Sequence, residues 1–175
     1  MHPLRELHSS REVAERIDRL AERIFGDYRG RPIVCVIIEE GARVFAEKLL
    51  ERLNGLGMQT ERVFVRAHRT HGSSLLPIKL EPMDPALFHA RDVLLLDDIA
   101  DEGRTLAAIL AQVRAGGPGS VRIAVLVSKH GRRRVDLEIA YSVFEVEKGW
   151  VVGFGMDLEG HYRELDHLAV IEGLD

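Results

Sequence analysis

Apolar runs that alternate with helical patterns are the feature that most constrains the fold of this chain. The run "PIVCVII" (residues 32–38) is continuously apolar, and so is the "VLLL" core of "DVLLLDDI" (residues 92–99). Such strands are typical of sheets that are covered on both faces. Residues 42–57 and 104–117 follow these runs with apolar side chains at helical spacing. The alternation predicts an α/β fold with a twisted, mainly parallel sheet flanked by helices.

The other expected elements fit the same pattern. Residues 9–24 are predicted to form a helix, because Ser9 followed by Glu12 is a capping-box pair ahead of apolar residues at helical spacing. Residues 69–89 contain three prolines and are predicted to form a long loop with a short strand at 78–80. Further strands are expected at residues 60–68 and 120–129.

The chain is expected to form a single domain, residues 1–175. A length of 175 residues is enough to bury a core. Three β-like runs come last, at residues 139–146, 150–157 and 168–173. The segment at about 139–175, with or without the N-terminal part, is therefore predicted to extend the sheet or to form a small β-rich hood beside it.

Composition excludes several classes of protein. The net charge of −4 gives no reason to expect a nucleic-acid partner. The single cysteine, Cys35, lies in an apolar run, which excludes a disulfide framework and is typical of a reducing compartment. No apolar stretch has the length of a membrane span, and the first residues lack the apolar segment of a signal peptide. We therefore expect a cytoplasmic protein.

The stretch "DVLLLDDIADEGRTLAAIL" (residues 92–110) indicates a binding site. Ligands of such sheets bind at the carboxyl ends of the strands, where Asp97, Asp98 and Asp101 lie. Gly103 and the helix start after it favour a phosphate, because a glycine allows close approach and the first N–H groups of a helix are free. The acids suit hydroxyl groups, a proton on a heterocycle, or Mg²⁺ brought by the substrate. The alternative is that they only cap the strand and the helix.

The residues "VLLLDDIADEGRTL" resemble the phosphoribosyl-pyrophosphate (PRPP) motif of type I phosphoribosyltransferases, which implies the fold of that family. The segment "KGWVVGFGMDLEGHYRELDHLAVI" (residues 148–171) is similar to the C-terminal part of hypoxanthine-guanine phosphoribosyltransferases. The run "AVLVSK" resembles the strand whose lysine reads the purine. The resemblance extends from about residue 33 to residue 171.

For PRPP, the resemblance implies one group of site residues. Asp97 and Asp98 would bind the ribose hydroxyls, and Asp101 would accept a proton near N7 of the purine as the catalytic residue. Arg163 would help to bind pyrophosphate, together with the loop after the first strand. The PRPP-binding residues implied are Asp97, Asp98, Asp101, Glu102, Gly103, Arg104 and Thr105, and the pyrophosphate loop contributes Glu40 and Gly41.

For the base and the metal, the resemblance implies a second group. Trp150 would stack on a 6-oxopurine, Lys129 would bind its exocyclic oxygen, and Val151 would present its backbone to the base edge. The alternatives are a core or interface tryptophan and a solvated lysine. The purine-binding residues implied are Ile99, Lys129, Trp150, Val151 and Asp157, and the Mg²⁺ ligands implied are Asp97, Asp98 and Asp157.

The chain departs from the family pattern at two loops and at one further residue. Glu40 and Gly41, preceded by Glu39, stand where the family often has Lys-Gly-Gly, and two acids beside a pyrophosphate are unfavourable unless Mg²⁺ or Arg43 lies between. The segment "RTHGSSLLP" (residues 69–77) offers serines but no tyrosine.

Glu102, in place of a threonine, is the third departure. We predict that its backbone N–H serves the phosphate while its carboxylate faces away. The neighbouring "KHGRRR" (residues 129–134) is interpreted as a solvated basic turn, and Arg132, Arg133 and Arg134 are assigned no role.

The resulting hypothesis is a purine-salvage enzyme that moves phosphoribose from PRPP to hypoxanthine or guanine. The family implies a homodimer or homotetramer. Two alternatives stay open: a PRPP- or nucleotide-binding regulatory protein with little turnover, and a transferase for another base. The altered pyrophosphate loop favours the regulatory protein, whereas Arg163 favours the enzyme.

Overall fold

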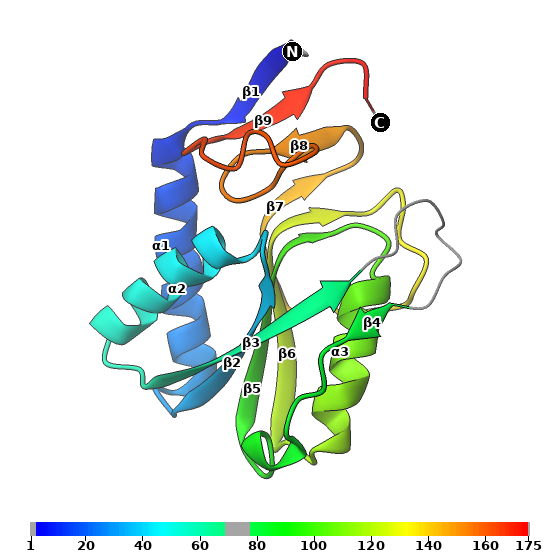
Figure 1. Cartoon of the computed structure of the whole chain (residues 1–175). Coiled ribbons are helices and arrows are strands. Elements are labelled where there is room, and N and C mark those ends of the chain that lie inside the picture. The colour runs from blue at the N-terminus through cyan, green and yellow to red at the C-terminus, as the bar shows by residue number, and fades with distance from the viewer. Residues whose placement is uncertain (1–2, 69–77, 175) are drawn as a thin grey trace.

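The computed structural model of the chain describes residues 3–68 and 78–174 and contains two β-sheets (Figure 1). In the larger sheet, β3, β2, β5, β6 and β7 run parallel, and β4 pairs antiparallel with β3 at the edge. The prediction of a mainly parallel sheet is therefore confirmed. In sheet order, the strands are β4 (Lys79–Leu80), β3 (Thr60–His68), β2 (Ile33–Glu39), β5 (Asp92–Ala100), β6 (Ser120–Lys129) and β7 (Tyr141–Val146).

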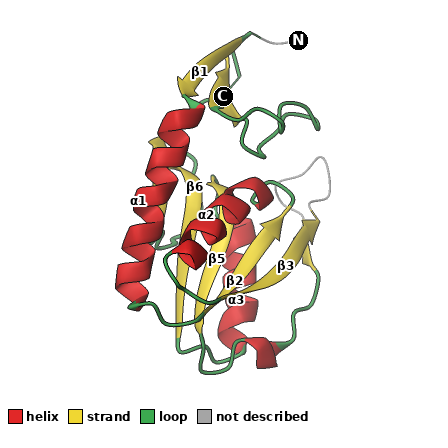
Figure 2. Ribbon diagram, turned by 90° about the vertical axis from the view of Figure 1, so that its left-hand side faces the viewer, coloured by secondary structure: helices red, strands yellow, loops and turns green. Residues whose placement is uncertain are grey.

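Helices cover both faces of this sheet (Figure 2). On one face lie α1 (Ser10–Tyr28) and α2 (Arg43–Gly55), and on the other lies α3 (Arg104–Ala115). Alternate side chains of β2 serve the two layers: Cys35 packs with the α1 and α2 side chains, whereas Val36 packs with those of α3. This double burial explains why β2 is apolar at successive positions. A short 3₁₀ helix, η1 (Pro85–Leu87), precedes β5.

The start of α1 follows the predicted cap only in part. The hydroxyl of Ser9 accepts a hydrogen bond from the backbone N–H of Glu12 at 3.3 Å. The Glu12 carboxylate does not return to the Ser9 backbone, as a complete capping box requires, but contacts Arg16 at 2.8 Å and His8 at 2.9 Å. The helix start is thus fixed by the serine, and the glutamate joins the helix to the strand before it.

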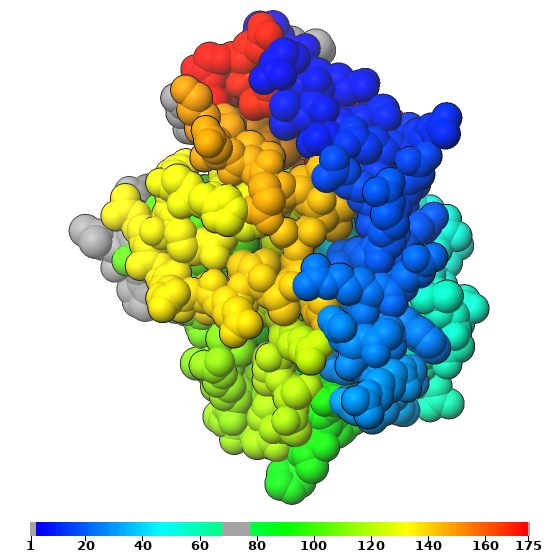
Figure 3. Space-filling model, turned by 180° about the vertical axis from the view of Figure 1, so that it is seen from behind, coloured from blue at the N-terminus to red at the C-terminus, as the bar shows by residue number. Residues whose placement is uncertain are grey.

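The smaller sheet forms a hood over the carboxyl edge of the larger one. Its antiparallel order is β1 (Leu4–His8), β9 (Leu168–Ile171) and β8 (Trp150–Val152). The N-terminal residues therefore lie against the C-terminal ones, as the blue and red atoms at the top of Figure 3 show. The hood begins later than the expected position of about residue 139, because β7 pairs with β6 in the larger sheet.

The segment between β3 and β5 contains the expected short strand. The short strand expected at residues 78–80 is β4, but residues 69–77, with the serines of the loop, lie outside the described residues. None of the helices in the described ranges is long and apolar enough to cross a membrane.

Two exposed glycines give opposite predictions for the same substitution. Gly26 lies inside α1 with nothing within 4 Å of an added Cβ, so Gly26→Ala should raise the free energy of unfolding by about 0.5–1 kcal/mol. Gly57 also has open space, but its φ of +93° disfavours any side chain, so Gly57→Ala should lower that energy by about 1 kcal/mol. Urea unfolding followed by circular dichroism measures both, and equal shifts would contradict the prediction.

Candidate active site

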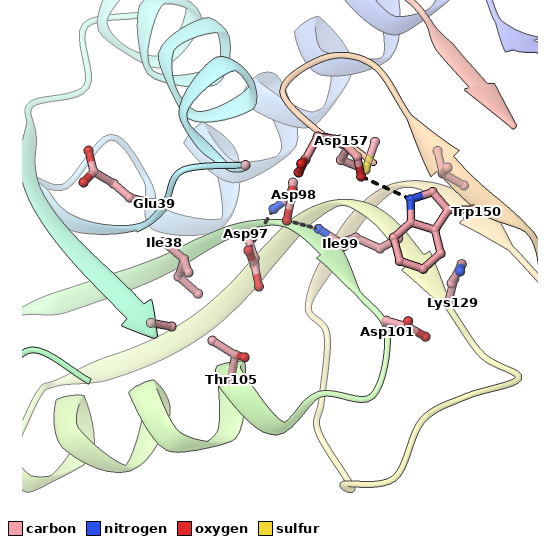
Figure 4. Close-up of a pocket in the computed structure, with 14 residues that line it drawn as sticks. Ile38, Glu39, Asp97, Asp98, Ile99, Asp101, Thr105, Lys129, Trp150 and Asp157 are labelled. Atoms are coloured by element: carbon pink, nitrogen blue, oxygen red, sulfur yellow. Dashed lines mark hydrogen bonds between the residues drawn. The ribbon is translucent and has the colours of Figure 1, made fainter. Parts of the chain in front are cut away.

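A pocket of about 300 Å³ lies where the carboxyl ends of the parallel strands meet the hood (Figure 4). This is the edge at which the sequence predicted a site. Ten of the sequence-predicted residues line it: Gly41, Asp97, Asp98, Ile99, Asp101, Thr105, Lys129, Trp150, Val151 and Asp157. Five others do not: Glu40, Glu102, Gly103, Arg104 and Arg163.

The acid pair at the end of β5 forms the floor of the pocket. Asp97 is buried, and its Oδ1 accepts a hydrogen bond from the backbone N–H of Asp98 at 3.0 Å. The Oδ1 of Asp98 accepts one from the N–H of Ile99 at 2.8 Å. Burial raises the pKa of Asp98, because desolvation disfavours its charged form. Burial therefore outweighs the hydrogen bonds that stabilise the Asp98 carboxylate. Because Asp98 lines the pocket, a ligand bound there could stabilise it further.

Gly41 lets the loop after β2 pass close to this acid pair. A Cβ at position 41 would lie 1.8 Å from Oδ2 of Asp98, closer than any real contact. On the other side, a Cβ at Gly155 would lie 2.4 Å from the carbonyl oxygen of Gly41. The loop thus lies between β5 and the hood, with a glycine at each of the two points of close approach.

Asp101 and the start of α3 form the next part of the site. Asp101 lines the pocket, and its Oδ1 is buried without a hydrogen-bond partner. Gly103 is the N-cap of α3 and has a φ of +84°, a conformation that favours glycine. Thr105, in the first turn, is buried at the pocket wall. The first N–H groups of a helix have no partner within the helix, and Asp101 and Thr105 bring this turn to the pocket, as a phosphate site would require.

Residues 101–105 are called the phosphate cradle below. The Glu102 side chain turns away from this cradle, as predicted. Its Oε1 lies 3.5 Å from Nε of Arg134 and 4.0 Å from Nη2 of Arg132, and its carbonyl oxygen accepts a bond from the N–H of Arg134 at 3.1 Å. The role of its backbone N–H in phosphate binding stays a prediction.

Residues 132–134 form an exposed turn at Arg132 and Arg134, as expected, but the turn also contacts the acidic segment. Arg132 also approaches Oδ2 of Asp101, at 3.7 Å, and the half-buried Arg133 donates hydrogen bonds to Ser128 at 3.1 Å and to the Ala100 carbonyl at 3.4 Å. The turn packs against the acidic segment, although some 30 residues separate them in the chain.

Lys129 and Trp150 lie on one side of the pocket, together with Asp101 (Figure 4). Lys129 is only 3% exposed, so the alternative of a solvated lysine is wrong. Trp150 is 37% exposed, and its indole N–H donates to the carbonyl oxygen of Asp157 at 3.1 Å. That bond fixes the ring while much of it stays accessible, which a core tryptophan would not show.

The acidic loop after β2 is neutralised by two arginines. The Glu39 carboxylate forms ion pairs with Arg43 and with Nε of Arg66, the latter at 2.9 Å, and its side chain is 8% exposed. The hydrogen bonds from Arg66 and Arg43 lower the pKa of Glu39. Glu40 is 74% exposed and lies 3.9 Å from Nη2 of Arg163. The negative charge expected at Glu39 is thus largely offset by Arg43 and Arg66. The sequence had indicated Arg43 but not Arg66.

Arg163 lines a second cavity of about 310 Å³, which shares Glu39 with the first. Its Nη1 donates to the carbonyl oxygen of Gly155 at 2.7 Å, and its Nη2 pairs with Oδ1 of Asp157 at 2.8 Å. Asp157 also accepts a bond from the N–H of Gly160 at 2.6 Å. Arg163 therefore joins the acidic loop to the hood beside the pocket.

The expected metal ligands lie in one pocket without forming a complete metal cage. Asp97, Asp98 and Asp157 all line it, yet across the described ranges no group of three or more His, Cys, Asp or Glu side chains is placed to hold a metal ion. Mg²⁺ often takes only one or two protein carboxylates and completes its octahedron with water and substrate oxygens. The residues fit a metal that arrives with its substrate.

Three lining residues were missed by the sequence reasoning: Ile38, Ala67 and Met156. Ile38 and Ala67 lie near the carboxyl ends of β2 and β3, so the strand-end rule that found Asp97 could have found them. Met156 lies in the hood, within a stretch already compared with the family, and its apolar side chain gave no separate signal.

Known proteins resemble the chain over most of its length. The sequence model of the phosphoribosyl transferase domain matches residues 3–159. Over 173 residues the chain is 28% identical to hypoxanthine-guanine phosphoribosyltransferase from Mycobacterium tuberculosis, a match that covers 95% of this chain and 85% of that protein. It is 26% identical over 169 residues to the protein of the same name from Dictyostelium discoideum, covering 95% and 94%.

Solved structures agree with the sequence matches. Hypoxanthine phosphoribosyl transferase from Trypanosoma cruzi has a TM-score of 0.89 at 25% identity, covering 95% of this chain and 90% of that one. A hypoxanthine-guanine phosphoribosyltransferase from Bacillus anthracis has a TM-score of 0.86 at 27% identity, covering 97% and 99%.

Proposed function

The chain belongs to the phosphoribosyltransferase family, and from this premise we propose that it transfers the 5-phosphoribosyl group from PRPP to hypoxanthine or guanine, releasing pyrophosphate. The relatives named hypoxanthine-guanine phosphoribosyltransferase support the choice of hypoxanthine or guanine as the base. One observation carries the proposal. The buried Lys129 and the accessible Trp150 line the same pocket as the acid pair of β5 and the start of α3.

The acid pair and the cradle would bind the ribose phosphate. Carboxylates accept hydrogen bonds from hydroxyl groups, which suits Asp97 and Asp98 for the ribose. The backbone from Asp101 to Thr105 would hold the 5′-phosphate at the start of α3, where free N–H groups and the helix dipole favour an anion. Asp101 and Thr105 line the pocket, whereas Glu102, Gly103 and Arg104 lie in the turn between them and would contribute through backbone N–H groups.

The other side of the pocket would bind the purine. The ring of Trp150 would stack on the base, and the ammonium group of Lys129 would donate to the oxygen at C6. Adenine has an amino group at that position, which cannot accept this bond, so a 6-oxopurine is favoured. Ile99 and the backbone of Val151 would complete the walls.

The reaction breaks the bond between C1 of the ribose and the pyrophosphate oxygen and forms a bond from C1 to a purine nitrogen. Positive charge that develops on the ribose is stabilised by the neighbouring Asp97 and Asp98 carboxylates. Asp101 would accept the proton that the purine loses, because its side chain lines the pocket. Arg163 and the loop at Glu40 and Gly41 would receive the departing pyrophosphate.

We also propose that the enzyme uses Mg²⁺: Asp97, Asp98 and Asp157 would hold the ion, which would supply positive charge to offset that of the pyrophosphate. Asp98 is a candidate to face the ion, because it lines the pocket and burial disfavours its charged form unless a cation lies nearby. Asp157 would contribute by exchanging part of its pairing with Arg163, directly or through water.

The proposal is tested by assaying the purified protein with PRPP, Mg²⁺ and each of hypoxanthine, guanine, xanthine, adenine, uracil and orotate. Nucleotide formation from hypoxanthine or guanine, abolished by a chelator, is expected. Product from another base would replace the substrate assignment. Binding of PRPP or a nucleoside monophosphate without product from any base would favour a regulatory protein, for which the exposed Glu40 in the pyrophosphate loop is the supporting observation.

Trp150 provides a binding signal, because it is the only tryptophan in the chain and is partly exposed. We expect its fluorescence to change when inosine or guanosine monophosphate binds. Adenosine monophosphate should need a concentration at least about tenfold higher, since the hydrogen bond from a charged lysine would be lost. Unchanged fluorescence at nucleotide saturation, established by calorimetry, would remove Trp150 from the base site.

A homodimer or homotetramer in the cytoplasm is part of the same proposal. The buried, unpaired Cys35 agrees with a reducing compartment. Light scattering of the purified protein measures the oligomeric state.

A further inference from the structure

The basic turn after β6 contacts the proposed proton acceptor. Nη1 of Arg132 lies 3.7 Å from Oδ2 of Asp101, and Nη2 of the same guanidinium lies 4.0 Å from Oε1 of Glu102. One planar side chain thus bridges the first two residues of the phosphate cradle. Since Arg132 and Asp101 are 31 positions apart, the fold rather than the local chain brings them together.

The other arginines of the turn have different partners. Arg134 approaches Glu102, at 3.5 Å, and Arg133 donates to Ser128 and to backbone carbonyl oxygens of Ala100 and Lys129. Arg132 is therefore the member of the turn that reaches the Asp101 carboxylate. Arg132 and Arg134 balance the charges of Asp101 and Glu102, so Glu102 does not add net negative charge to the cradle.

The two oxygens of Asp101 have different surroundings. Oδ2 faces the Arg132 guanidinium, whereas Oδ1 is buried and has no hydrogen-bond partner. Because Oδ1 is inaccessible, Oδ2 is the oxygen that a ligand in the pocket can reach, and Arg132 lies beside it. The guanidinium itself stays protonated and cannot take the proton from Asp101.

We propose that Arg132 is a positioning residue for the transfer reaction: anchored on Glu102, it holds Oδ2 of Asp101 in place to receive the proton that the purine loses. This inference rests on the proposed function and deepens it. It also gives Glu102 a purpose, which is to anchor Arg132 from a position that points away from the phosphate.

The contact acts on geometry rather than on stability. The Arg132 side chain is 47% exposed and its distances are long, and pairs of this kind contribute little to the free energy of folding. Orientation of a catalytic group matters far more, because a misplacement of about 1 Å can reduce a rate about 100-fold. Loss of Arg132 should therefore change turnover while leaving the thermal midpoint almost unchanged.

The test compares Arg132→Gln with Arg132→Lys and with Arg134→Gln, which removes a neighbouring arginine that pairs with Glu102. For Arg132→Gln we expect kcat to fall about tenfold or more, with KM for PRPP changed less than about threefold. Arg132→Lys should recover part of kcat, and Arg134→Gln should stay within about twofold of the parent protein. Crystal structures of the parent and of Arg132→Gln should show the Asp101 carboxylate in different orientations.

Three results would overturn the inference: an unchanged kcat in Arg132→Gln, an equal loss in Arg134→Gln, or a rise in KM for PRPP that accounts for the whole loss. The last would make Arg132 a phosphate ligand. If the parent protein transfers phosphoribose to no base, the proposed function fails instead. The crystal structures then decide the positioning alone, and an identical Asp101 in both would refute it.

Discussion

Replacing Asp101 with asparagine is expected to lower kcat about 10²–10⁴-fold, the usual contribution of a general base. Asparagine has nearly the same shape as aspartate but cannot accept the proton that the purine loses. Oδ1 of Asp101 is already buried without a partner, so removing the charge should not destabilise the fold. Steady-state assays with hypoxanthine and guanine measure kcat, and urea unfolding measures stability.

The matched control for this variant is the binding of product. The change in Trp150 fluorescence should report an affinity for inosine monophosphate within a few-fold of that of the parent protein, because the base and phosphate contacts remain. A variant that binds the product and turns over at the parent rate would show that another group takes the proton. Loss of binding together with turnover would make Asp101 a binding residue instead.

The sequence was sufficient to predict the parallel sheet and the position of the site. Successive apolar residues such as Cys35 and Val36 are needed because each faces a different helical layer, and that requirement is visible in the chain itself. Asp97 and Asp98 were found because strand ends of one direction meet at one edge.

The partners of charged residues could not be predicted in the same way. Arg66 neutralises Glu39 because β2 and β3 pair with these two residues in register, and Arg132 reaches Asp101 because a turn folds back over the edge of the sheet. Such pairs depend on register and loop path, which no local pattern specifies. The same holds for the hood, where Leu4 pairs with Ile171.

Replacing Gly41 with alanine is the second change with a large expected effect. The new Cβ would lie 1.8 Å from Oδ2 and 2.6 Å from Cγ of Asp98, so one of the two residues must move. The loop cannot retreat freely, because Gly155 packs against its carbonyl oxygen. We expect Asp98 to leave its place, with kcat/KM for PRPP reduced at least about 100-fold and the free energy of unfolding lowered by about 1–3 kcal/mol.

A double-mutant cycle isolates the contact between Gly41 and Asp98. Asp98→Ala removes the atoms that the new methyl group would meet, so adding Gly41→Ala to it should cost much less stability than Gly41→Ala costs alone. Activity should stay low in both backgrounds, because Asp98 is absent or displaced in each. Gly55→Ala, at a helical glycine with open space around it, is the control and should leave PRPP affinity unchanged. Additive losses of stability would mean that the loop yields rather than Asp98, and that the close approach of Gly41 is not what holds the acid pair in place.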